Sequence, residues 1–239
     1  MPIETKRSYD TLHGRAEAAP IDAGLRSYML RVYNYMASGL ALTGLVAAAV
    51  ASSETAIDVI FGTGLFWVAV LAPLGLVFFL SARIHAMKAS TAQALFWVYA
   101  AVMGLSMASI FLQFTGASVA RVFFITAGTF AAMSLYGYTT HKDLSGWGSF
   151  LFMGLIGLIL ASLVNLFLAS SMLHFIISAA GVLVFTGLTA YDTQRIKEMY
   201  LEADGAEIAA KKAVMGALQL YLDFINLFVM LMNLLGDRR

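Results

Sequence analysis

The sequence contains no cysteine and only three prolines, and charged residues make up 12% of its 239 positions. Without cysteine the chain has no disulfide framework, no thiolate metal site and no cysteine nucleophile. Soluble domains carry roughly 25% charged residues, about twice the fraction found here. The net charge of +1 does not indicate a nucleic-acid partner. Because 60% of the residues are hydrophobic and stand in long blocks, the composition excludes a water-soluble globule. It indicates a polytopic membrane protein, whose first partner is the lipid bilayer.

Seven apolar stretches are long enough to cross a hydrocarbon core of ~30 Å, which needs about 20 residues. They are residues 32–51, 62–82, 91–112, 118–138, 147–169, 172–191 and 213–235. They predict an all-α, seven-helix transmembrane domain over residues 31–236. Residues 1–30 are then a mobile cytoplasmic N-terminal tail, and 237–239 the C-terminal end.

Two of the connections between these stretches are open to more than one reading. The break between the fifth and sixth stretches, at "LASSML", is weak. The combined run is too long for one crossing, however, and we therefore expect two helices. The sixth connection, "TQRIKEMYLEADGAEIAAKK", is the long one, and its helical apolar rhythm favours an interfacial helix.

The basic residues predict the orientation of the chain. Lys and Arg occur in the N-terminal tail and in the second, fourth and sixth connections, and the first, third and fifth connections have none. The positive-inside rule then places the N-terminus in the cytoplasm, and seven crossings place the C-terminus outside. Arg238 and Arg239 oppose this arrangement, and a re-entrant last segment would remove the conflict. We favour seven full spans.

Two aspartates lie where a membrane helix is expected to be apolar. Asp223, in "GALQLYLDFINLF", is about eleven residues into the last stretch, and Asp192, in "GLTAYDTQRIK", closes the sixth. An ionisable group near the bilayer centre costs at least ~2.5–3.5 kcal/mol, so such groups usually face the bundle interior and serve a function. If the sixth connection extends the helices by a turn or two, the two carboxyl groups reach similar depth. Two close carboxylates in a low dielectric cannot both ionise cheaply, so the pair titrates as one unit.

Such a pair predicts a pH-sensing dyad, and its hard oxygens predict a weak metal site for calcium. We expect Tyr191, Gln194 and Asn226 to be the supporting polar residues, and Arg83 at the end of the second stretch to be the cationic partner. Each residue also has a structural explanation. Asp192 alone can cap a helix end, Asp223 can hydrogen-bond a neighbouring Tyr or Asn, and Arg83 can be an ordinary interfacial anchor.

An intramembrane aspartyl protease also has two aspartates on neighbouring spans, one of them in a Tyr-Asp pair such as Tyr191-Asp192. In those enzymes the second aspartate follows Gly-x-Gly, but here Asp223 follows "LYL". Their Pro-Ala-Leu element is absent too, since Pro73 is the last proline. We therefore expect no catalytic residues and no enzyme activity.

Three segments together resemble the Bax inhibitor-1 family, the transmembrane Bax inhibitor motif group, in its bacterial YccA-like branch. They are "YGYTTHKDLSGWGSFLFMGLIGLILASLVN", "AYDTQ" and "LYLDFINLF". The resemblance extends from about residue 26 onward. It implies a seven-helix bundle whose last helix is central and surrounded by the other six, in a bacterial cytoplasmic (inner) membrane.

Bacterial members of that family resemble pH-sensitive calcium leak channels. The resemblance implies that Asp192 and Asp223 form the gating pair and that Arg83 is the latch of the closed state. The acidic residue that some members carry in the second helix is missing from "GTGLFWVAVLAPLGLVFFLSA", which puts calcium selectivity in question. The YccA-like branch also resembles modulators of a membrane-bound AAA protease.

Residues and resemblance together predict a passive calcium leak gated by the aspartate pair, with no cofactor apart from weakly bound calcium. A regulator that binds other membrane proteins without transporting ions is the alternative. A proton-coupled calcium exchanger is a third.

Overall fold

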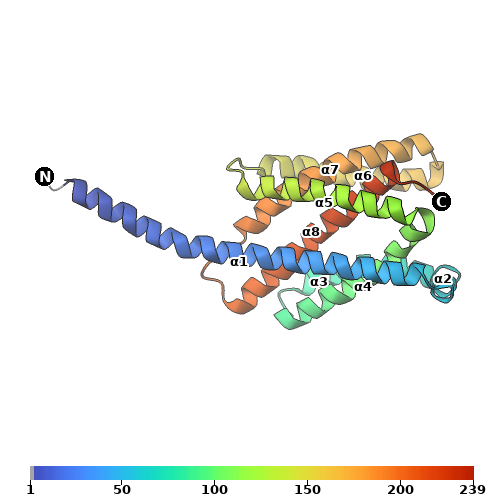
Figure 1. Cartoon of the computed structure of the whole chain (residues 1–239), viewed down its shortest axis with the longest axis horizontal. Coiled ribbons are helices and arrows are strands. Elements are labelled where there is room, and N and C mark those ends of the chain that lie inside the picture. The colour runs from blue at the N-terminus through green and yellow to red at the C-terminus, as the bar shows by residue number, and fades with distance from the viewer. Residues whose placement is uncertain (1–2) are drawn as a thin grey trace.

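The computed structural model describes residues 3–239, with side chains from residue 23 onward. Within this part the chain folds into helices, with one isolated β-bridge between Phe114 and Arg238 (Figure 1). The helices are α1 (Ile3–Ala51), α2 (Glu54–Phe61), α3 (Leu65–Arg83), α4 (Ala89–Gln113), α5 (Gly116–Thr139), α6 (Ser145–Leu168), α7 (Ser171–Glu198) and α8 (Ala206–Leu235). All except α2 are long and apolar enough to cross a membrane, which confirms the seven predicted spans.

The first connection contains a helix that the sequence reading missed. The Ser53 side chain caps α2 by accepting a hydrogen bond from the Ala56 N–H, and Glu54 places a negative charge in the first turn. Both features stabilise a helix start. At eight residues α2 is too short to cross a bilayer.

The weak break between the fifth and sixth stretches is real. Ala169 adopts a left-handed conformation with φ of 48°, and its N–H donates to the Asn165 carbonyl, which ends α6. The Asn165 side chain accepts a hydrogen bond from the Ser170 N–H at 3.0 Å, and Ser170 in turn caps α7. The prediction of two separate helices is therefore confirmed.

The long sixth connection was predicted wrongly. It does not form an interfacial helix, because α7 continues to Glu198 and α8 begins at Ala206. Its apolar rhythm belongs to these two helix ends. The short loop that remains is held by Lys212, whose Nζ lies 2.6 Å from an Asp204 carboxylate oxygen and 2.9 Å from the Met199 carbonyl.

The last helix is central, as the family resemblance implied. Of the α8 span 67% is buried, against 11% of the α6 span. α8 packs against α1, α4, α5 and α7, whereas α3 packs on α4 and α6 on α7. The expectation that all six other helices surround α8 is thus met by four of them, with α3 and α6 on the outside.

Two series of hydrogen-bonded hydroxyl groups connect the buried faces of the helices. The Tyr221 hydroxyl of α8 lies 2.6 Å from Thr43 Oγ1 of α1, which lies 2.8 Å from the Ala100 carbonyl of α4. Ser134 of α5 lies 2.7 Å from the Tyr33 hydroxyl of α1 and 3.0 Å from the Thr193 hydroxyl of α7. Interhelical hydrogen bonds in lipid contribute about 0.6–2 kcal/mol each. These contacts therefore define how the helices are rotated against one another.

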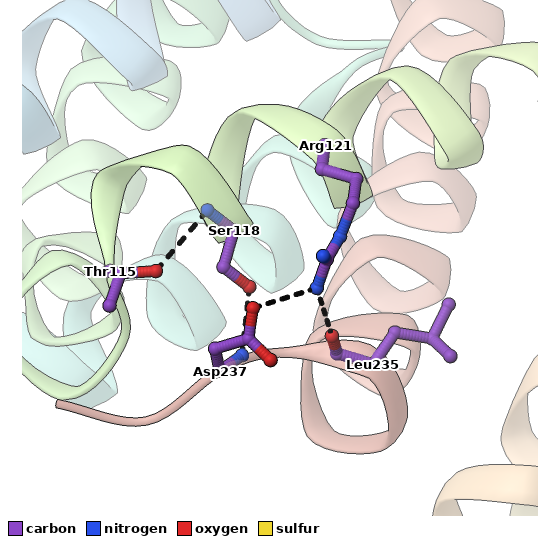
Figure 2. Close-up of polar contacts among 5 residues, drawn as sticks. All are labelled: Thr115, Ser118, Arg121, Leu235 and Asp237. Carbon is purple, nitrogen blue, oxygen red and sulfur yellow. Dashed lines mark hydrogen bonds and ion pairs between the residues drawn. The ribbon is translucent and has the colours of Figure 1, made fainter.

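The C-terminal end is tied to the connection between α4 and α5 (Figure 2). Arg121 donates to the Leu235 carbonyl and to the Asp237 carboxylate, both at 2.9 Å, and the Asp237 N–H donates to Ser118 Oγ at 2.8 Å. α8 is one continuous helix of 30 residues, which is about 45 Å long. The last segment is therefore long enough for a full crossing, and it has none of the breaks that a re-entrant turn requires.

The N-terminal boundary lies earlier than predicted. Residues 1–2 and the side chains of residues 3–22, where most of the predicted mobile tail falls, lie outside the described part. From there on α1 is packed, since Tyr28 is 5% exposed and Met29 is 2% exposed. The packed part of α1 therefore begins before the predicted start at 32.

Candidate functional site

Asp192 of α7 and Asp223 of α8 meet in the interior of the bundle. Each is 5% exposed, and the two carboxyl groups are within hydrogen-bonding reach of each other. They can meet because both helices are longer than predicted: α7 continues past residue 191 to Glu198, and α8 begins at Ala206, before residue 213. α8 also runs obliquely across its neighbours from the loop to the C-terminus (Figure 1). The expectation that these two acids lie at similar depth is thus correct.

A direct hydrogen bond between the two acids would require a proton on one of them, because a carboxylate oxygen can only accept a hydrogen bond. Gln219, one helical turn before Asp223, is within hydrogen-bonding reach of the Asp192 carboxyl group. Asp223 Oδ2 is buried and has no hydrogen-bond partner in the described part of the chain. The two acids therefore have different surroundings: Asp192 has the Gln219 side chain beside it, whereas one oxygen of Asp223 has no protein partner.

Both aspartates line a cavity of about 500 Å³ between α6, α7 and α8. The cavity wall combines apolar side chains with amide, hydroxyl and charged groups. Its lining residues are Gly148, Ser149, Phe152, Leu155, Phe185, Leu188, Tyr191, Asp192, Arg195, Gln219, Leu222, Asp223 and Asn226. A space of this size is large enough for several water molecules, since one water occupies about 30 Å³ of the liquid.

The cation beside the pair is Arg195, not the predicted Arg83. Arg195 is exposed and lines the cavity, and Asp192 precedes it by three residues on the same face of α7. Arg83 ends α3, is exposed, and forms no ion pair within residues 23–239. Because α3 packs on α4, the structure does not bring Arg83 to the aspartates.

The family model described as Inhibitor of apoptosis-promoting Bax1 matches residues 25–239 of this chain. The chain belongs to the Bax inhibitor-1 family. Its relatives include the uncharacterized protein RP147 of Rickettsia prowazekii, 51% identical over 96% of this chain and 97% of the relative. The inner membrane protein YbhL of Escherichia coli K12 is 49% identical over 91% of this chain and 94% of YbhL. A Caulobacter vibrioides protein is 46% identical over 92% of each chain.

Two of the three predicted supporting residues lie at the site of this Bax inhibitor-1 protein. Tyr191 lines the cavity with its ring against Gly148, where a Cβ atom would clash with it. Asn226 also lines the cavity, and its Nδ2 donates to the Leu222 carbonyl at 2.9 Å.

Gln194 does not support the aspartate pair. Its Oε1 accepts from the Leu144 N–H at 2.9 Å, and its Nε2 donates to the Lys142 carbonyl at 2.8 Å. It thus fastens the connection between α5 and α6. Two residues after Asp192 on a helix, Gln194 points to the opposite face.

Sequence reasoning missed Gln219 and Arg195, although their spacing could have revealed them. Gln219 stands four residues before Asp223, and Arg195 three residues after Asp192. Both spacings place the side chains on the same helix face as the acid.

The predicted metal role of the pair has little support from neighbouring residues. Within the described residues, no three His, Cys, Asp or Glu side chains gather where they could hold a metal ion. Calcium takes six to eight oxygen ligands, more than two carboxyl groups supply. The remainder would have to come from Gln219, Asn226, backbone carbonyls and water.

Proposed function

We propose that this Bax inhibitor-1 family member is a passive, pH-sensitive leak pathway for cations, calcium by preference, in a bacterial cytoplasmic membrane. The N-terminus lies on the cytoplasmic side in this proposal. The observation that carries it is the buried approach of Asp192 and Asp223 to each other on the wall of a cavity of about 500 Å³ that polar and apolar side chains both line.

The pair senses pH because its charge changes with its proton count. With one shared proton the dyad carries a single negative charge, which attracts a nearby cation. When acid supplies the second proton the charge disappears, and the attraction that holds the closed arrangement weakens. A bundle with two arrangements that differ by a few kcal/mol responds to such a change.

Calcium is the transported ion in this proposal and has no resident site. The carboxyl oxygens of Asp192 and Asp223 and the amide oxygens of Gln219 and Asn226 offer hard ligands along the cavity. An incomplete ligand set suits a leak, since conduction requires an ion to bind and then leave.

Arg83 acts as the latch in this proposal when α3 lies against α7 and α8. The described arrangement, with α3 on α4 and Arg83 exposed, then corresponds to the released latch. Arg195 is the charge that remains beside the pair in both arrangements.

Calcium influx into liposomes containing only this protein tests the proposal. We expect influx to be greater at pH 6 than at pH 8, and Asp223→Asn to remove that dependence. Asp237→Asn is the matched control, because it removes an exposed carboxylate at the other end of α8. Unchanged pH dependence in both Asp223→Asn and Asp192→Asn would contradict the mechanism.

The regulator that binds other membrane proteins, such as an AAA protease, stays the second candidate. It is favoured by the length of α1, whose 49 residues are more than twice the about 20 that one crossing needs. Absence of influx at either pH would favour this function. Opposed calcium and proton movements under an imposed proton gradient would indicate an exchanger instead.

A further inference from the structure

A long apolar groove runs between α1 and α5, away from the aspartate pair. α1 packs on α4 and α8, and α5 on α7 and α8, which leaves a space between them with Phe224 of α8 at its base. The space consists of a cavity of about 750 Å³ and a further one of about 270 Å³, which share Leu40, Phe123 and Phe224. The larger one extends along α1 from Arg26 to Ala41, and the smaller one continues to Ala47.

Small side chains on both walls keep the groove open. Ala37 and Ala41 of α1 face Ala127 and Ala131 of α5 across the larger cavity. Small residues on two membrane helices ordinarily allow close packing, but here the two walls enclose free apolar volume. From Arg26 to Leu40 the groove is about 21 Å long, somewhat more than the ~15 Å hydrocarbon depth of one leaflet. Its length and lining suit an extended acyl chain.

Two basic side chains, Arg26 and Lys197, lie at one end of this groove. Arg26 lines it directly and is exposed. Tyr138 lines the same end, and Lys197 of α7 lies with Nζ 2.9 Å from the Tyr138 carbonyl and 5.5 Å from the centre of its ring. The groove therefore pairs a basic mouth with an apolar interior, which matches the two halves of an acidic phospholipid.

We propose that this groove is a binding site for one anionic phospholipid from the leaflet at the N-terminal end of the α1 span. One acyl chain lies between α1 and α5 along Ala37 and Ala131, and the phosphate-bearing headgroup binds Arg26 with help from Lys197. The proposal does not depend on ion transport, because the groove lies outside the cavity that Asp192 and Asp223 line.

Native mass spectrometry of the full chain in detergent tests the site, with phosphatidylglycerol and phosphatidylcholine of identical acyl chains as probes. We expect the first phosphatidylglycerol to bind about fivefold more tightly than phosphatidylcholine, as one basic side chain near a headgroup provides. Arg26→Gln should remove that preference. Arg31→Gln is the matched control and should keep it, because Arg31 does not line the groove and lies in the adjoining hollow beside Trp97, which Arg26 also borders.

A second variant tests the acyl-chain half of the site. Ala127→Phe places a ring in the groove and should weaken the binding of both lipids, with the preference for phosphatidylglycerol unchanged. Ala132→Phe, at an exposed position next to the groove wall, should bind both lipids as the unmodified chain does.

Three results with these variants would overturn the proposal. They are a preference that survives Arg26→Gln, an equal loss in Arg31→Gln, and full binding in Ala127→Phe. Effective competition by glycerol phosphate, which has no acyl chain, would also overturn it, because the site would then recognise a free phosphate.

Discussion

The two aspartates are chemically the same but have different surroundings. Asp192 has Gln219 and Arg195 beside it, whereas one oxygen of Asp223 is buried without a partner. An unsatisfied buried polar atom costs about 1–3 kcal/mol. Water in the adjoining cavity or the Asp192 carboxyl group must therefore satisfy this oxygen, so Asp223 depends on its neighbours as ionisable groups in membranes usually do.

Charge removal at the two arginines should separate their roles. Arg195→Gln takes away the cation that lines the same cavity as Asp192 and Asp223, so we expect the pH midpoint of calcium influx to shift. Arg83→Gln should instead increase influx at pH 8, because the proposed latch is lost. Both are measured in liposomes. Identical pH profiles for Arg83→Gln and the unmodified chain would remove Arg83 from the mechanism.

Asp143, in the connection between α5 and α6, provides an internal check on any pH response. The hydroxyl and N–H of Ser145 hold the pKa of the Asp143 carboxyl below its ordinary value of 3.8. A lowered pKa stabilises the fold above 3.8, and this contribution is lost only as the pH falls through the lowered value. Asp143→Asn should therefore leave the response between pH 8 and pH 6 unchanged. A shifted influx profile in this variant would show a sensor outside the aspartate pair.

At the scale of helices, α5 and α7 approach each other at Gly137. A Cβ atom there would clash with the Ala190 backbone, which cannot move as a side chain can. We expect Gly137→Ala to destabilise the bundle by about 1–3 kcal/mol, as overpacking does. Gly128→Ala on the same helix is the matched control, since a Cβ atom there meets nothing within 4 Å. Thermal unfolding in detergent compares the two. Equal stability of the two variants would mean that α5 and α7 can move apart at Gly137 without destabilising the bundle.

α3 is the element whose movement the gating proposal requires. Because the chain has no native cysteine, spin labels can be attached uniquely at Ser81→Cys on α3 and Glu198→Cys on α7, both exposed. We expect the distance between the labels to be shorter at pH 8 than at pH 6. The difference should vanish in the Asp223→Asn background. A distance that does not change with pH would leave α3 without a gating role.

At the scale of the whole molecule, the C-terminal residues join the ends of α4, α5 and α8. The Arg121–Asp237 pair has side chains 54% and 66% exposed, so Asp237→Asn should cost at most about 1 kcal/mol. Deleting residues 237–239 should cost more. It also removes the bonds from the Asp237 N–H to Ser118, from the Thr115 N–H to the Asp237 carbonyl and from the Arg239 N–H to the Gln113 carbonyl. Chemical denaturation of both variants, at low and high salt, tests whether the deletion lowers the free energy of unfolding more than Asp237→Asn does. Equal losses of stability in the two variants would mean that the Arg121–Asp237 side-chain pair alone stabilises the C-terminal end.

The number and places of the spanning helices could be predicted because the bilayer sets the length of an apolar helix. The break at Ala169 was also predictable, because the two apolar stretches that flank it are together too long for one crossing of the bilayer. The boundaries at Glu198 and Ala206 were not predictable. Polar and basic residues at membrane interfaces continue a helix as readily as they end it.

The sequence by itself determined the family, the seven spans and the two acids, because each depends on residue type and order along one chain. Only the tertiary structure decided which side chains meet the acids. Gln194 lies close to Asp192 in sequence yet faces Leu144 and Lys142, and Arg195 takes the place predicted for Arg83. The physical reason is rotational: a helix turns about 100° per residue. The oblique course of α8 and the packing of α3 on α4 then decide which faces come together.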